Sequence, residues 1–186
     1  MRSPFAHLVL LALLPSRPRA RSRRTGSAPR ATVRRLRSDE SGTVQEVFDG
    51  MGTEARRMRY LVATPRLTGH MRRRLAGIHP DWHVVVVAEI HGTPVGLGRF
   101  VRTPSCPERA EVAVEVVDRW VGRGIGRQLL DHVLREAGAA GVGVVTASVL
   151  PENKAMIGLL RARRAVLRRV DGLVEVELPL DTARVA

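Results

Sequence analysis

A glycine-rich loop flanked by arginines is the part of this chain whose residue types and spacing point most directly to chemistry. It reads Val-Gly-Arg-Gly-Ile-Gly-Arg-Gln over residues 121–128. Glycines let backbone N–H groups approach an anion, and the N-terminus of a following helix adds partial positive charge. The loop therefore predicts a cradle for a phosphorylated cofactor. Its candidate binding residues are Val121, Gly122, Arg123, Gly124, Ile125, Gly126, Arg127 and Gln128.

Two well-known nucleotide motifs do not fit this loop. A Walker loop ends in Gly-Lys-Ser/Thr, whereas Gly126 is followed by Arg127 and Gln128. A dinucleotide fingerprint needs Gly-x-Gly-x-x-Gly and an acidic residue at the end of the next strand, and the predicted strand 142–149 ends without one. Coenzyme A, which carries a pyrophosphate and no ribose diol to be read by an acid, is the remaining candidate.

Two glutamates just before the loop could move protons. Residues 109–117 alternate as a strand, which places Glu111 and Glu115 on one face and three valines on the other. A carboxylate beside a cofactor loop can accept a proton directly or through a water molecule. The alternative is that both glutamates are solvated residues on a half-exposed strand face.

The elements that must position these residues form an α+β pattern. Paired strands come first, and strands crossed by helices follow, which predicts a mixed sheet. Asp39 or Ser41 could cap the first helix, Thr68 the third, and Asp171-Gly172 is a hairpin turn. Gly96 and Gly98 could mark a bulge. The predicted strands are 32–37, 83–90, 94–102, 109–117, 142–149, 166–170 and 173–180; the predicted helices are 43–51, 54–61, 69–76, 127–140 and 154–163.

The order of these motifs resembles the GNAT acetyltransferases. Residues 120–130 resemble motif A of that family, and Val-Leu-Pro-Glu-Asn-Lys-Ala-Met at 149–156 resembles the start of its motif B. The resemblance covers roughly residues 31–180, and the segments 99–102 and 110–113 are similar to the GNAT domain of bacterial Pat-type protein lysine acetyltransferases. It implies a GNAT fold: a mixed, mostly antiparallel sheet flanked by helices and splayed between strands 4 and 5.

The resemblance also implies a reaction, the transfer of acetyl from acetyl-CoA to a primary amine. Glu111 matches the glutamate that protein-acetylating members use as base, and Glu115 is a second candidate. A backbone N–H near Val116 or Val117 would stabilise the oxyanion. Asn153 would contact the pantetheine arm, or cap its helix, or do both.

Three positions depart from the family pattern. Val121 stands where the family has Gln or Arg, and Arg164-Ala165 stands where Gly-Phe closes motif B. Leu160 stands where many members carry the tyrosine that protonates the leaving thiolate. Tyr60 is the only tyrosine in the chain, and it could serve only if the fold brings it to the site.

The acceptor stays open at this point. A protein lysine is the first candidate, and a small-molecule amine is an alternative within the same enzyme class. A non-catalytic acyl-CoA-binding regulatory domain is a different class. Four residues of the second predicted helix are candidates for substrate contact, against the alternative of a solvated basic helix face: Arg56, Arg57, Arg59 and Tyr60. We expect a monomer or a homodimer.

Charge is concentrated near the N-terminus. The net charge is +13, but ten arginines and no lysine or acidic residue fall in residues 1–38, so +3 is left for residues 39–186. We therefore expect no specific nucleic-acid partner. Residues 1–30 are either a disordered basic leader or the product of a start codon set too early, and residues 31–186 form the GNAT domain.

Neither a membrane anchor nor a metal site is expected. The apolar run 5–14 is too short to span a bilayer, and the arginines that follow it oppose export, so we expect a cytoplasmic protein. The single Cys106 and six scattered histidines show no metal-ligand spacing.

Overall fold

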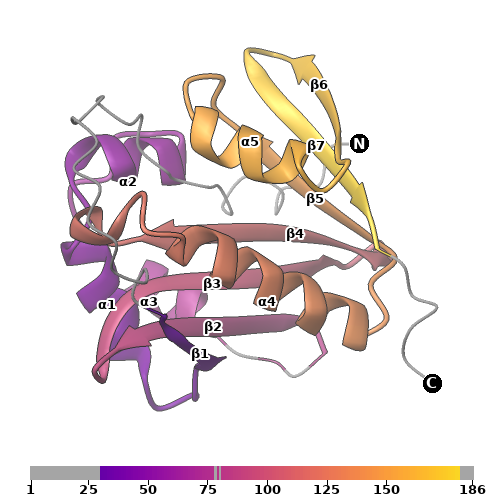
Figure 1. The fold of residues 1–186 in the computed structure, drawn as a ribbon. Helices are drawn as coiled ribbons and strands as arrows, with labels where there is room; N and C mark the ends of the chain where they lie inside the picture. Colours follow the sequence, from indigo (N-terminus) through magenta and orange to yellow (C-terminus); the bar gives the residue numbers. More distant parts are fainter. Residues whose placement is uncertain (1–29, 78, 80, 181–186) are drawn as a thin grey trace.

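The computed structural model describes residues 30–77, 79 and 81–180. Seven strands form one sheet in the order β1-β2-β3-β4-β5-β7-β6 (Figure 1). Every neighbouring pair is antiparallel except β4 and β5, which run parallel. The predicted mixed, mostly antiparallel sheet is therefore confirmed. The strands are β1 (Thr32–Arg35), β2 (His83–Ile90), β3 (Thr93–Thr103), β4 (Cys106–Val116), β5 (Val144–Val149), β6 (Val166–Val170) and β7 (Leu173–Pro179).

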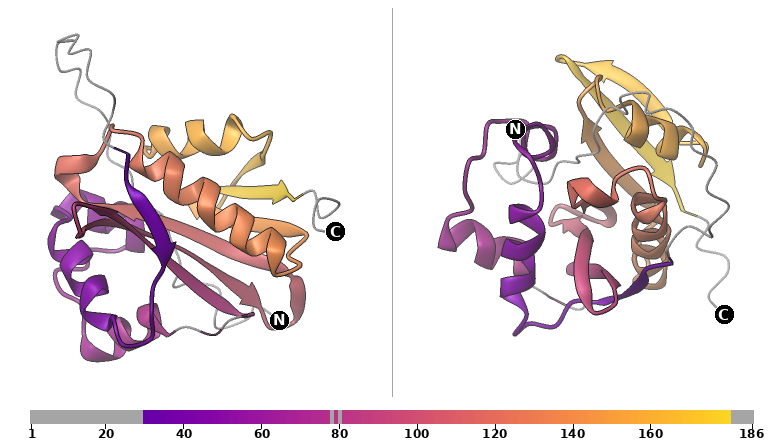
Figure 2. Two further views of the ribbon diagram at one scale, coloured as in Figure 1. Left: turned by 60° about the horizontal axis from the view of Figure 1, so that its bottom comes forward. Right: turned by 60° about the vertical axis from the view of Figure 1, so that its left-hand side comes forward.

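Helices cover both faces of the sheet. Figure 2 shows α4 and α5 on one side, and the helices that precede β2 on the other. The helices are α1 (Ser41–Asp49), α2 (Thr53–Tyr60), α3 (Gly69–Ala76), α4 (Ile125–Ala139) and α5 (Lys154–Arg161), and the 3₁₀ turn η1 is Asp118–Trp120. Within these residues, no helix is long and apolar enough to cross a membrane. The predicted leader, except for its last residue, lies outside the described residues.

Strand alternation divides the core into two layers. Val86 of β2 packs with Leu129 and Val133 of α4, whereas Val87 packs with residues of α1 and α3. Residues Val84 to Ala88 are all at most 2% exposed. The apolar run in β2 is thus buried on both faces, as its composition predicted.

Gly96 and Gly98 let α4 approach the sheet closely. A Cβ atom on Gly98 would lie 2.6 Å from Cγ2 of Val133, and one on Gly96 would lie 2.9 Å from Cδ1 of Leu129. The bulge predicted at these glycines is displaced: Ala88 pairs with Gly96 and Glu89 with Pro94, so the irregularity falls at the position between them. Gly98 is thus required by the packing of α4, whereas a Cβ atom on Gly96 would lie closest to the Glu115 carbonyl oxygen of β4, at 2.6 Å.

The splay predicted between the fourth and fifth strands is present. β4 and β5 pair at three positions only, and the last of them joins Glu111 to Thr146. β4 then continues to Val116 and β5 to Val149 without further pairing to each other. A wedge therefore opens between the two strands, and Glu111 stands at its closed end.

Several local predictions also have clear outcomes. Thr68 caps α3, where its hydroxyl accepts the Met71 N–H at 3.2 Å. Asp171 and Gly172 form the β6–β7 turn with φ of 50° and 81°. The predicted caps of α1 are wrong, because Glu40 occupies the N-cap position and makes no side-chain capping bond.

Candidate active site

The loop before α4 has the backbone that its glycines predicted. Gly122 and Gly124 have φ of 78° and 83°, in the left-handed region that favours glycine. A Cβ atom at either position would meet nothing within 4 Å, so the space above the loop is open. The first turn of α4 has N–H groups without intrahelical acceptors, and these are the donors that an anion can use.

Some residues of the loop can offer a ligand only their side chains, and others only their backbone groups. The backbone N–H of Gln128 donates to the Gly124 carbonyl within α4, so only its side chain is available to a ligand. Ile125 is fully buried and contributes backbone alone, and Val121 packs partly buried against the core. Arg123 and Arg127 are exposed, and the Arg123 guanidinium lies 5.0 Å from the Trp120 ring centroid.

The open edge of β4 supplies a second set of donors. The N–H of Val117 donates to the Val95 carbonyl at 3.0 Å, so the prediction that it could serve as an oxyanion donor is wrong. Because donors alternate sides along a strand, the N–H of Val116 points the other way, toward the wedge. Val112 and Val114 present their peptide groups to the same side.

Glu111 carries a carboxyl group that is poised to change charge. Its Oε1 atom is buried without a hydrogen-bond partner. Burial raises the pKa of Glu111 to about 8, and the Glu175 charge adds to that rise while Arg59 opposes it. The alternative of a solvated surface residue is met only in part, because Glu111 is partly buried and lines a pocket.

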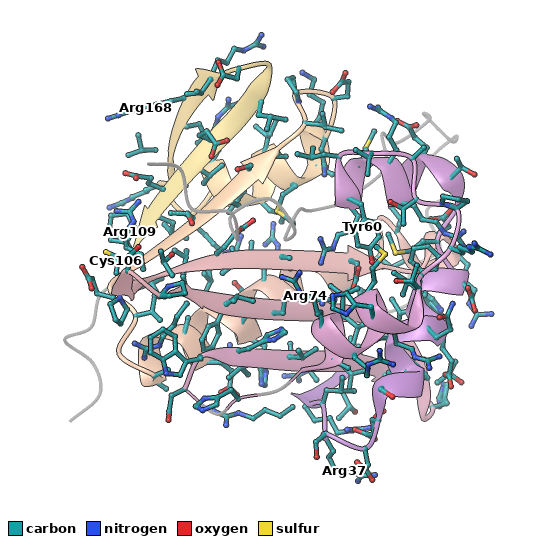
Figure 3. All side chains as sticks on the ribbon, turned by 180° about the vertical axis from the view of Figure 1, so that it is seen from behind. Arg37, Tyr60, Arg74, Cys106, Arg109 and Arg168 are labelled. Carbon is teal, nitrogen blue, oxygen red and sulfur yellow. The ribbon has the colours of Figure 1, made fainter. Side chains whose placement is uncertain are left out.

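A pocket of about 760 Å³ opens over Glu111. Its floor is one row of paired residues that crosses six strands: His83, Val101, Glu111, Thr146, Glu177 and Val166. A neighbouring row adds Ser148, Glu175 and Arg168. Figure 3 views this face, with Arg74 beside β3 and Arg168 at the far edge of the sheet.

Glu115 does not fit the role of base that the sequence allowed for it. It is 2% exposed, and its carboxylate accepts from Arg59 at 3.0 Å and from Arg99. Burial alone would raise the pKa of Glu115, but Arg99 and Arg59 outweigh burial and hold that pKa below its usual range. Glu115 is thus an ionised anchor for two buried arginines.

The second helix contributes structure more than substrate contacts. Arg59 is fully buried against Glu115, and Arg56 donates to the Phe48 and Pro65 carbonyls at 3.2 and 2.9 Å. Arg57 forms an exposed ion pair with Glu54. These three candidates therefore have partners within the fold, and the fourth, Tyr60, also contacts Glu115.

Tyr60 is brought to the same face of β4, but beside Glu115. Its hydroxyl lies 3.4 Å from Oε2 of Glu115, and its ring centroid lies 5.8 Å from that of Phe48. Burial and the Glu115 charge raise the pKa of Tyr60, which keeps the phenol protonated. Leu160 is 1% exposed and belongs to the core.

Asn153 acts as a helix cap in this structure. Its side chain is fully buried and accepts the Met156 N–H at 3.1 Å, which begins α5. Of the two predicted roles, the cap is the one observed.

Within the described part of the chain, no group of three or more His, Cys, Asp or Glu side chains could hold a metal ion.

The sequence missed the residues that the sheet register brings to Glu111. His83 lines the pocket with Nε2 buried and unpartnered, and burial together with Arg99 lowers the pKa of His83 to about 3. Ser148 donates to Glu175 at 2.8 Å, and Arg168 is exposed on β6. Only the Asp-Gly turn, which fixes the β6–β7 register, signalled any of these positions in advance.

Comparison with known proteins identifies the family of this chain. The sequence model of the acetyltransferase (GNAT) family matches residues 53–164, which include the loop, the wedge and both glutamates. The chain belongs to this family. The resemblance seen in the two sequence motifs is thereby confirmed.

Individual relatives agree with that assignment. The chain is 38% identical over 95 residues to acetyltransferase Pat of Mycolicibacterium smegmatis; the match covers 49% of this chain and 28% of that protein's length. The GNAT domain of S. lividans PAT matches with a TM-score of 0.76 and 27% identity, over 81% of this chain and 90% of that one.

A third structure extends the likeness in fold. The putative acetyltransferase yncA from Salmonella typhimurium, solved with its cofactor acetyl-CoA, matches with a TM-score of 0.68 and 21% identity. That match covers 82% of this chain and 95% of the other. At this identity, the likeness concerns the fold alone.

Proposed function

We propose that this GNAT acetyltransferase transfers acetyl from acetyl-CoA to a primary amine, with Glu111 as general base. The observation that carries the proposal is the position of Glu111 at the closed end of the β4–β5 wedge, where its Oε1 atom is buried without a hydrogen-bond partner. A pocket large enough for a small ligand or a side chain opens over it. Family membership supplies the reaction class, and this carboxyl group supplies the proton acceptor.

The loop and the wedge fit the two ends of acetyl-CoA. The pyrophosphate would lie on the N–H groups at the start of α4, with Arg123 and Arg127 neutralising its charge. The pantetheine arm would run along the open edge of β4, as an added strand would. The Val116 N–H would then donate to the oxygen on which negative charge develops. The acetyl thioester supplies the acyl group, and this chain supplies the donors and the base.

Glu111 is matched to the proton it must take. A lysine amine has a pKa of about 10.4 and is almost entirely protonated at neutral pH, so attack requires that a proton be removed. A carboxylate with a pKa of about 8 is a far stronger base than an ordinary glutamate near 4.5. An ammonium ion that enters the pocket also favours ionisation of Glu111, which prepares the carboxylate to accept the proton.

Protein lysine is the acceptor that we propose first, by similarity to acetyltransferase Pat. A small-molecule amine is the alternative, because a pocket of about 760 Å³ also suits a free ligand. A non-catalytic acyl-CoA-binding domain is the third alternative, and it predicts that a Glu111→Gln substitution causes no loss of cofactor affinity or of rate.

Calorimetric titration of the full chain with acetyl-CoA tests the cofactor part of the proposal. Gly124→Ala should weaken binding by about fivefold to thirtyfold, because alanine at a φ of 83° costs roughly 1–2 kcal/mol and displaces the N–H cradle. Gly138→Ala is the matched control on α4, since its added Cβ also meets nothing within 4 Å. Equal affinity in the two variants, or no acetyl-CoA binding by the wild type, would contradict the proposal.

A further inference from the structure

We propose that the acceptor lysine is flanked by acidic residues, and that Arg168 at the pocket edge recognises them. This inference rests on the proposed function, because it concerns the acceptor side of the same site. It is carried by the balance of charge in the pocket over Glu111 and by the position of Arg168 on the edge strand β6.

Arginines outnumber glutamates in the pocket lining. Five arginines and three glutamates line it, so two positive charges are in excess. Burial raises the pKa of Glu111 to about 8, so near neutral pH this glutamate is mostly protonated before an amine enters, and the excess is larger still. A pocket with excess positive charge repels polycations and attracts an amine whose neighbouring groups are anionic.

The positive charges differ in how far they are compensated. Arg99 is paired with Glu115, and Arg109 is paired with Glu177. Arg102 donates to backbone carbonyls of Pro107 and Ala140, which satisfy its hydrogen bonds without cancelling its charge. The two remaining lining arginines, Arg74 and Arg168, are exposed and form no ion pair among the described residues.

Arg168 is the arginine best placed to meet an incoming anion. It is exposed on β6, the last strand of the sheet, and it lies opposite Glu175, whose Oε2 already accepts the Ser148 hydroxyl at 2.8 Å. Val166 and Val170 flank it on the same face and are 48% and 46% exposed. An anionic group carried on a peptide could pair with Arg168 while its aliphatic parts cover these valines.

The geometry sets how far the acid lies from the lysine. β4 and β6 are three strand spacings apart, which is about 14 Å, and the Arg168 side chain shortens that span. An extended peptide advances roughly 3.3–3.6 Å per residue, so an acidic residue within about three positions of the lysine can reach Arg168 while the amine lies at Glu111. The acceptor class is therefore a lysine peptide with acidic flanks.

The test compares three lysine peptides of equal length whose flanking residues are acidic, neutral or basic. With the full chain and saturating acetyl-CoA, kcat/KM should be at least about tenfold higher for the acidic than for the basic peptide, and this ratio should fall as salt rises. Arg168→Glu should abolish or reverse the preference. The matched control is Arg169→Glu, which makes the same charge change on the next residue of β6, outside the pocket lining, and should leave the preference intact.

Other outcomes overturn the inference in separable ways. Equal kcat/KM for the three peptides, or an equal effect of the two glutamate variants, would refute recognition by Arg168 while leaving the acetyltransferase chemistry in place. Acetyl-CoA binding without acetylation of any lysine peptide would refute the acceptor class. Failure of acetyl-CoA to bind at all would instead refute the proposed function itself.

Discussion

Glu111 and Glu115 lie four residues apart on one face of β4, and their surroundings give them opposite properties. Glu115 accepts from two buried arginines, whose charge holds its pKa below the usual range. Glu111 has an unpartnered oxygen, and burial raises its pKa to about 8. The difference teaches that burial alone does not determine how a carboxyl group behaves; the partners that the fold brings to it decide between an anchor and a base.

Removing the charge of Glu115 should have the largest effect on stability. Glu115→Gln leaves Arg59 and Arg99 without a buried counter-charge, so we expect a loss of roughly 3–5 kcal/mol in the free energy of unfolding. Urea denaturation measures it. Glu54→Gln, which breaks the exposed ion pair with Arg57, is the control and should cost less than about 1 kcal/mol. If the two variants lost equal stability, the anchor role would be refuted.

Replacing Glu111 by glutamine should raise, rather than lower, the free energy of unfolding in alkaline solution. The folded state keeps a proton on Glu111 up to about pH 8, whereas an unfolded glutamate loses it near 4.5. Stability therefore falls as pH rises between these values, and Gln, which does not titrate, avoids the loss. We expect Glu111→Gln to stabilise the protein by roughly 1–3 kcal/mol at pH 9 and to change little at pH 4.

Denaturation of wild type and Glu111→Gln at both pH values checks this expectation. A loss of stability at pH 9 would mean that the Glu111 carboxylate is paired in solution, and the contrast with Glu115 would disappear. A functional site often lowers the stability of the fold, because its activity requires a group, here the Glu111 carboxylate, in an environment that disfavours its charge.

Tyr60 should give the smallest effect. Its hydroxyl contacts Glu115 at a long 3.4 Å, so Tyr60→Phe should cost less than about 1 kcal/mol of stability. A thiol has a pKa near 8.5 and its thiolate leaves readily without an acid, so kcat should stay within about threefold of the wild type. A tenfold fall in kcat at unchanged stability would instead identify Tyr60 as the general acid.

Local patterns in the sequence predicted much of the fold. The alternation in β4, the apolar run in β2 and the Asp171-Gly172 turn each report on neighbouring residues, and each prediction agrees with the structure. The order of strands, loop and helices matched a known family, which supplied the splay between β4 and β5. The caps of α1 were wrong because several polar residues could precede that helix, and the chain uses Glu40.

The site depends on contacts that no local pattern contains. Glu115 meets Arg59 across 56 sequence positions, so its pairing follows from how α2 packs on the sheet. The row that joins His83 to Val166 through Glu111 is set by the register of five strand pairs. Alternation predicted the face on which both glutamates lie, but not which of them would be paired.

The pH dependence of kcat/KM for wild type and Glu111→Gln tests the central claim most directly. In the wild type, the plot of log kcat/KM against pH should change slope near pH 8, where Glu111 ionises. Above that break, kcat/KM should follow ionisation of the amine alone. Glu111→Gln should lose about 10²–10⁴-fold in rate, lack the break, and bind acetyl-CoA with unchanged affinity. If the variant kept both the rate and the break, Glu111 would not be the base.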